Sequence, residues 1–169
     1  MRTETTWDAD EAVTQLYAAH YTSLVRLGAL LLRDAGAAED VVQDAFVAMH
    51  GKWGRLRDPH KAHAYLRQAV VNRARSALRH RSVVARHRPE QPANAPGADR
   101  DVLRHEQRSQ VLAALDGLSQ RQREVLVLRF YLDLSEEQIA DTLGISKGAV
   151  KSHASRGLDS LRTAWEHSS

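Results

Sequence analysis

The chain has 169 residues, which is enough for one ordinary domain or two small ones. Hydrophobic residues make up 43% of it, so a packed core is expected and global disorder is not. Cysteine is absent, which excludes disulfides and thiolate metal sites. No stretch reaches the roughly 20 apolar residues of a membrane-spanning helix, and the polar N-terminus lacks the apolar segment of a secretory signal. We therefore expect a cytoplasmic protein without membrane insertion.

The net charge of +3 is small, but the charges are unevenly distributed. Residues 59–89 contain no Asp or Glu, whereas both flanking segments contain more acidic than basic residues. The basic residues of this block are Lys61, Arg67, Arg73, Arg75, Arg79, Arg81, Arg86 and Arg88. Such a block indicates polyanion binding. The alternative is a solvated, Arg-rich helix face, although such faces usually mix both signs of charge.

Four segments are predicted in the first half of the chain. Apolar residues recur at helical spacing over about 10–33 until Gly36 breaks the pattern, and a second helix is expected over about 37–50. Residues 51–60 contain glycines and an Asp-Pro pair, which predict a loop with at most a short helical turn. A long helix is then expected over about 61–81.

The long helix has two distinct faces. Leu66, Val70, Ala74 and Leu78 recur every fourth residue and predict a core stripe. The roughly opposite face carries amide and guanidinium groups, which are suited to base edges and phosphates. Its residues are Gln68, Asn72, Arg75 and Arg79.

A proline-bearing linker is expected over residues 83–103, because three prolines fall there and no helical period remains. The predicted fold is therefore all-α, with small helical domains at 1–82 and 104–169 joined by a flexible linker.

Four helices are predicted in the second half. The first covers about 102–117, and the next begins at Ser119, with Val125, Leu126, Leu128 and Phe130 as its apolar residues. A third helix begins at Ser135 and ends at Gly144. The fourth runs from Ser146 to about Trp165. Its expected buried residues are Val150, Ala154, Leu158, Leu161 and Trp165.

The last two helices have the anatomy of a helix-turn-helix. Ala140 is small enough for close helix packing, and Gly144 permits a tight turn. Lys and Ser side chains lie away from the apolar stripe of the second helix, which suits insertion into the major groove of DNA. The alternative is a helical hairpin that is packed for structural reasons alone. The expected DNA-contacting residues are Lys147, Lys151, Ser152, Ser155 and Arg156.

Motifs in both halves resemble the sigma-70 family of RNA polymerase sigma factors. In the second half these are LSQRQREVLVLR (118–129), LSEEQIA (134–140) and GISKGAVKS (144–152), which resemble the promoter-recognition domain. In the first half they are AEDVVQDAF (38–46) and AYLRQAVVNRA (64–74), which are similar to the polymerase-binding and −10-reading helices. Two such domains joined by a linker resemble the small extracytoplasmic-function (ECF) class.

This resemblance implies that core RNA polymerase, through its β′ clamp and β flap, and promoter DNA are partners. An anti-sigma factor is a further possible partner. The first domain would bind the clamp through Asp40, Gln43, Asp44 and Phe46. Phe46 could equally be a core residue.

The resemblance also implies a role for each basic helix. The long helix and its preceding loop would capture the −10 element, and the helix-turn-helix would read the −35 element. The −10 candidates are Arg57, His60, His63, Tyr65, Asn72, Arg75 and Arg79. Tyr65 could instead lie in the core. Ser76 stands where many relatives have an acidic residue, which leaves the preferred −10 sequence open.

Two other classes of protein are alternatives. A stand-alone helix-turn-helix regulator would bind duplex DNA tightly without polymerase, but the first half looks like neither a receiver nor a ligand-sensing domain. An enzyme is disfavoured because His60 and His63 form the only suggestive histidine pair, and no carboxylates accompany them at ligand spacing. No catalytic residue, metal or cofactor is therefore expected.

Overall fold

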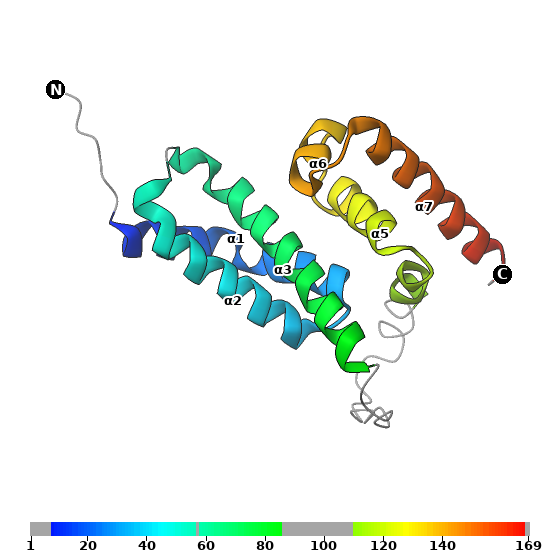
Figure 1. Ribbon diagram of the computed structural model, residues 1–169, viewed down its shortest axis with the longest axis horizontal. Helices are drawn as coiled ribbons and strands as arrows, with labels where there is room; N and C mark the ends of the chain where they lie inside the picture. Colours follow the sequence, from blue (N-terminus) through cyan, green and yellow to red (C-terminus); the bar gives the residue numbers. More distant parts are fainter. Residues whose placement is uncertain (1–7, 57, 86–109, 168–169) are drawn as a thin grey trace. The chain divides into compact units, whose positions relative to one another are not determined.

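The computed structural model describes residues 8–56, 58–85 and 110–167 (Figure 1). Within these ranges the chain consists of helices and short connections without a β-strand, which confirms the predicted all-α class. It divides into two compact units, residues 1–77 and 78–169.

The first unit is built from three long helices. They are α1 (Ala9–Leu32), α2 (Ala35–Lys52) and α3 (Ala62–Ala85), and the last continues past the unit boundary. Two 3₁₀ turns, η1 (Trp53–Arg55) and η2 (Pro59–Lys61), occupy the predicted loop. Figure 1 shows α1 and α2 side by side and antiparallel. The last residues of α3, 83–85, fall in the segment expected to be linker, and 86–103 lie outside the described residues.

The break between α1 and α2 is not at Gly36, as predicted, but two to three residues earlier. Arg33 adopts a left-handed conformation with φ of 58° and ends α1. The side chain of Asp34 then accepts a hydrogen bond from the Ala37 N–H at 3.1 Å, so Asp34 is the N-cap of α2. Gly36 lies inside the first turn of α2, because a single glycine costs a helix only about 1 kcal/mol.

The core of the first unit follows the predicted apolar stripes. Leu66, Val70 and Ala74 of α3 are buried, whereas Leu78 is only half-buried. The buried residues of α2 are Ala38, Val41, Val42, Ala45, Phe46 and Met49. The helices α1 and α2 approach closely at Gly28, where an added Cβ would lie 3.0 Å from the Cβ of Ala38.

The second unit contains shorter helices around one long helix. Residues 110–116 are helical, and they are the described part of the helix expected over 102–117. They are followed by α5 (Gln120–Leu126), a π-helical turn η3 (Val127–Tyr131) and α6 (Glu136–Leu143). Both α5 and α6 pack against α7 (Lys147–His167).

Three apolar side chains of this unit are exposed, and two of them, Leu158 and Trp165, were predicted to be buried. Phe130 is 64% exposed, because the wider π-helical turn alters the α-helical register before it. Leu158 and Trp165 are 44% and 71% exposed. They lie in the second half of α7, a helix of 21 residues whose partners α5 and α6 have only seven and eight. At 1.5 Å per residue, such short helices cannot cover its full length.

Candidate nucleic-acid interface

A capping box at its start and a left-handed glycine at its end define the first helix of the predicted helix-turn-helix, α6. The hydroxyl of Ser135 accepts from the Gln138 N–H at 3.1 Å, and the Gln138 side chain accepts from the Ser135 N–H at 2.9 Å. This capping box satisfies two N–H groups that the helix leaves free. At the other end Gly144 has φ of 67°, the left-handed conformation that glycine adopts without strain.

The turn leads directly into α7. The Ile145 N–H donates to the Ala140 carbonyl at 3.1 Å, and the Ala149 N–H donates to the Ser146 hydroxyl at 3.1 Å. Ala140, Val150 and Ala154 are buried, so the two helices share one apolar seam. The angle between α6 and α7 is thus fixed by local hydrogen bonds and by packing.

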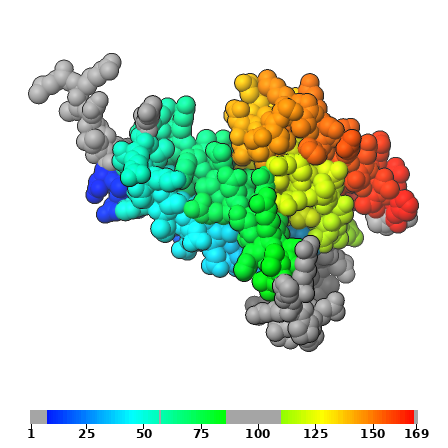
Figure 2. Space-filling view, in the orientation of Figure 1, coloured from blue at the N-terminus to red at the C-terminus, as the bar shows by residue number. Residues whose placement is uncertain are grey.

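The first half of α7 presents all of its predicted DNA-contacting residues to solvent. These are Lys147, Lys151, Ser152, Ser155 and Arg156. In Figure 2 the orange residues of α6 and the start of α7 form one continuous part of the surface. The exposed helix can therefore offer ammonium, hydroxyl and guanidinium donors to a ligand.

This face is not purely basic, because carboxylates of α6 lie beside its lysines. Lys147 Nζ is 3.7 Å from Glu137 Oε2, and Lys151 Nζ is 3.8 Å from Glu136 Oε2. Glu136 also lies 3.8 Å from Arg129 of η3. These acidic neighbours were not expected from the sequence, although the position of both glutamates in the first turn of α6 was a usable signal.

The outer face of α3 carries the second group of predicted DNA-contacting residues. Asn72 and Arg79 are exposed and Arg75 is half-buried, all on one helix. Tyr65 is also half-buried, with Lys52 Nζ 5.8 Å from its ring centroid. Thus α3 combines an amide, two guanidinium groups and one partly accessible aromatic ring.

The predicted residues at and before the start of α3 have different environments. Asp58 caps η2 by accepting from the His60 N–H at 3.0 Å, and the His60 side chain is exposed. His63 instead stacks on His20 of α1, with ring centroids 3.8 Å apart, and burial lowers its pKa to about 4. The His63 ring is therefore packed against α1, and its assignment to DNA stays a prediction. Arg57 lies outside the described residues.

The predicted polymerase-binding face of α2 retains its polar residues but not its aromatic one. Asp40, Gln43 and Asp44 are exposed, whereas Phe46 is buried at 4% exposure. Its ring lies 5.2 Å from that of Tyr17, so the core assignment of Phe46 is the correct one. The exposed large apolar residue on α2 is Val47 at 71%, which the sequence motif did not indicate because Val47 falls just outside it.

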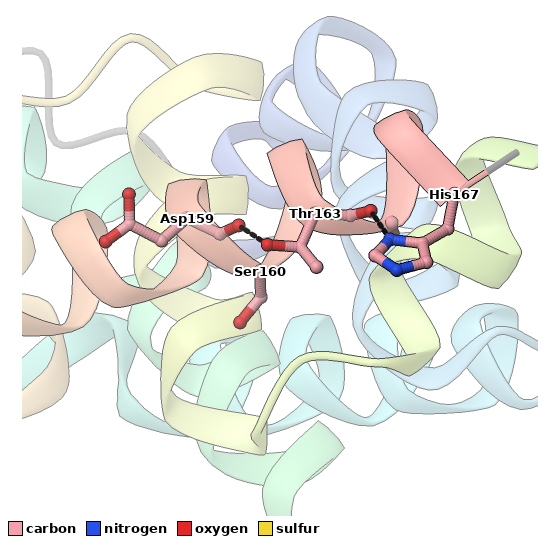
Figure 3. Close-up of a pocket in the computed structure, with 5 residues that line it drawn as sticks. Asp159, Ser160, Thr163 and His167 are labelled. Atoms are coloured by element: carbon pink, nitrogen blue, oxygen red, sulfur yellow. Dashed lines mark hydrogen bonds between the residues drawn. The ribbon is translucent and has the colours of Figure 1, made fainter. Parts of the chain in front are cut away.

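A hollow of about 560 Å³ lies on the second half of α7, and its described lining residues, shown in Figure 3, all come from that helix. There Thr163 donates to the Asp159 carbonyl, and the His167 ring contacts the Thr163 carbonyl.

Among the described residues, no three side chains of His, Cys, Asp or Glu gather into a metal site. None of the described helices is long and apolar enough to cross a membrane.

Comparison with known proteins shows which family the chain belongs to. The family model of sigma-70 region 2 matches residues 16–83, and that of sigma-70 region 4 matches residues 108–161. The RNA polymerase sigma-E factor of Streptomyces avermitilis is 33% identical over 144 residues, covering 85% of this chain and 79% of that protein. The chain belongs to the sigma-70 family.

A second relative supports this assignment, and two solved structures have a similar fold. The ECF RNA polymerase sigma factor SigM of Mycobacterium tuberculosis is 33% identical over 150 residues, which cover 86% of this chain and 72% of that one. The fold is similar to that of the sigma factor RpoE in complex with the anti-sigma factor NepR from Bartonella quintana. The TM-score is 0.71 at 23% identity, and the match covers 90% of this chain and 96% of that one. It is also similar to CnrH in complex with the cytosolic domain of CnrY, with a TM-score of 0.70 at 24% identity over 95% of this chain and 96% of that one.

The protein is thus an ECF sigma factor that binds core RNA polymerase and promoter DNA and directs promoter-specific transcription initiation. The alternative of a stand-alone helix-turn-helix regulator is not favoured, because region 2 accompanies region 4.

Proposed function

We propose that this sigma factor reads a promoter with two separate helices. Region 2 would extend over residues 1–82 and region 4 over 104–169, with 83–103 as the linker. In region 4, α7 would read the −35 element through Lys147, Lys151, Ser152, Ser155 and Arg156. In region 2, α3 would capture the −10 element through Asn72, Arg75 and Arg79, with Arg57, His60 and Tyr65 before or near the start of that helix.

The observation that supports this proposal best is the exposure of the first half of α7 within a fully capped helix-turn-helix. Its first residues are accessible, and the packed seam of Ala140 and Val150 holds the helix rigidly. A rigid helix with an accessible N-terminal half is what insertion into the major groove requires.

Replacing Lys151 with Ala tests the −35 assignment. We expect reduced transcription from −35-dependent promoters, because a Lys contact contributes to phosphate and base-edge recognition. Multi-round transcription with core polymerase over a promoter library is the measurement. Arg162→Ala is the matched control, since Arg162 is an exposed cation further along α7 and pairs with Asp159 at 3.0 Å. Normal output from Lys151→Ala would refute the contact.

The −10 assignment is tested by the double substitution Arg75→Ala with Arg79→Ala. We expect weaker promoter opening with unchanged polymerase binding, because both side chains lie on the α3 face that would hold the displaced strand. Permanganate footprinting of the open complex measures the effect. The double variant Arg26→Ala with Arg55→Ala removes the same charge from exposed sites outside α3. Equal opening by both double variants would contradict the assignment.

For the polymerase, we propose that Asp40, Gln43 and Asp44 of α2 contact the β′ clamp, since exposed carboxylates suit a basic partner surface. The β flap would be contacted by region 4.

We also propose that an anti-sigma factor regulates the protein. One of the solved structures named above is a complex with an anti-sigma factor, and the other is a complex with the cytosolic domain of a second protein. We further propose that the protein acts in the cytoplasm and catalyses no reaction of its own.

A further inference from the structure

The lysines of the recognition helix are each placed beside a glutamate of the preceding helix. The Lys147–Glu137 and Lys151–Glu136 pairs measure 3.7 and 3.8 Å between nitrogen and oxygen. Glu136 lies equally close to Arg129, at 3.8 Å, so one carboxylate lies between two cations. All three cations are well exposed, with side-chain exposures of 60% for Lys147, 68% for Lys151 and 42% for Arg129.

The backbone fixes the carboxylates near the lysines even when the side chains move. Glu136 and Glu137 are the first two residues of α6, directly after Ser135, whose side chain forms the capping box with Gln138. The positive end of the helix dipole stabilises negative charge in this first turn. Exposed ion pairs of this kind contribute at most about 1 kcal/mol to stability, so their effect on local potential matters more than their strength.

The acidic and basic side chains of the helix-turn-helix are equal in number. Between Glu136 and Arg156 there are as many acidic as basic side chains, although α7 itself has no acid before Asp159. The acidic residues are Glu136, Glu137 and Asp141, and the basic ones are Lys147, Lys151 and Arg156. A phosphate that approaches either lysine also approaches a carboxylate, and like charges brought together oppose binding.

We infer that Glu136 and Glu137 set the DNA affinity of the free protein by neutralising Lys147 and Lys151. They hold sequence-independent duplex binding low, so that region 4 engages DNA chiefly when polymerase brings it to a promoter. This inference rests on the proposed contact between α7 and DNA.

Duplex binding by the full chain without polymerase tests the inference. The variant is Glu136→Gln with Glu137→Gln, and Gln138 still closes the capping box. The probe is a labelled duplex of about 30 base pairs without promoter sequence, followed by fluorescence anisotropy from about 50 to 200 mM salt. We expect binding several-fold tighter than wild type. We also expect log K to fall more steeply with log salt, by about 0.9 for each additional phosphate that the variant neutralises.

The matched control is Asp159→Asn with Glu166→Gln, which makes the same change in net charge on the distal half of α7. It also releases one exposed cation, because Asp159 pairs with Arg162 at 3.0 Å. The inference requires the Glu136/Glu137 variant to bind more tightly than this control. Equal affinity of the two variants, or no increase over wild type, overturns it.

Removing the lysines separates failure of the inference from failure of the proposed function. Lys147→Ala with Lys151→Ala is introduced into wild type and into the glutamine variant. If it lowers duplex affinity in both while the glutamine changes have no effect, only the inference is overturned. If it changes affinity in neither, the proposed contact of α7 with DNA is overturned as well.

Discussion

At the scale of single residues, burial decides which polar groups of α3 remain exposed to solvent. His63 Nε2 and Arg67 Nε are both shielded from solvent, and neither has a hydrogen-bond partner among the residues that the structure describes. Burial also lowers the pKa of each group, and for His63 the stacked His20 ring and the positive charge of Arg67 act in the same direction. His63 therefore acts as a neutral packing residue between α1 and α3.

Replacing His63 with Gln should change how stability depends on pH. The pKa of His63 is about 4 in the folded protein and about 6.5 when unfolded, so between these values only the unfolded chain binds the proton. Wild type should therefore lose stability as pH falls from about 6.5 to about 4. His63→Gln should lose less over that range, as measured by urea unfolding at several pH values. His80→Gln, at an exposed site on the same helix, is the control and should keep the wild-type pH dependence.

If wild type and His63→Gln lose the same free energy of unfolding over this range, His63 is not the group that binds the proton. The comparison uses the slope against pH, so a constant loss of packing energy in the variant does not affect it.

At the scale of secondary-structure elements, close helix packing depends on small residues. An added Cβ at Gly28 of α1 would lie 3.0 Å from the Ala38 Cβ and 3.3 Å from the Ala38 Cα of α2. Because a backbone atom lies this close, a larger residue cannot be accommodated by a change of side-chain rotamer alone. The approach of the two helices fixes the position of α2 and hence of its exposed acidic face.

Gly28→Ala should destabilise the first unit. Overpacking typically costs about 1–3 kcal/mol, against an opposing contribution of about 1 kcal/mol from the higher helix propensity of Ala. Gly51→Ala is the matched control, because Gly51 also lies in a helix but has nothing within 4 Å of its added Cβ. Urea unfolding followed by circular dichroism should show Gly28→Ala below wild type and Gly51→Ala at or above it. Equal midpoints for the two variants would show that α1 and α2 can shift by the few tenths of an ångström that the added Cβ requires.

At the scale of the whole molecule, the faces that we propose for polymerase and for the −35 element lie in different units. The first is the acidic face of α2, and the second is the exposed first half of α7. Each face is exposed within its own unit, so the two can be altered separately. This division is consistent with a factor that must bind polymerase and DNA at the same time.

Charge reversal on α2 should separate polymerase binding from DNA binding. Asp40→Arg with Asp44→Arg should weaken binding to core polymerase by about tenfold or more, because it replaces two carboxylates that would face a basic surface. The measurement is competition for core polymerase against wild type. Glu11→Arg, at an exposed site on α1, is the control. Wild-type affinity in the double variant would mean that polymerase does not contact this part of α2.

The sequence by itself determined the features that depend on neighbouring residues. Helix periodicity predicted the α-helices within a few residues, and the helices expected to begin at Ser119 and Ser135 do so, each with a capping box. Gly144 took the left-handed conformation that its position suggested. Such features need only interactions within about four residues, so tertiary contacts seldom change them.

Only the tertiary structure decided which side of each helix is covered and by what. It buried Phe46 against Tyr17, left Phe130 and Trp165 exposed, and paired His63 with His20. It also brought carboxylates of α6 to the lysines of α7. The pattern of apolar and charged residues along the chain shows that a helix has an apolar or a charged face. The lengths and crossing positions of the neighbouring helices determine which residues contact that face. Those quantities depend on residues far apart in the chain, which no local pattern records.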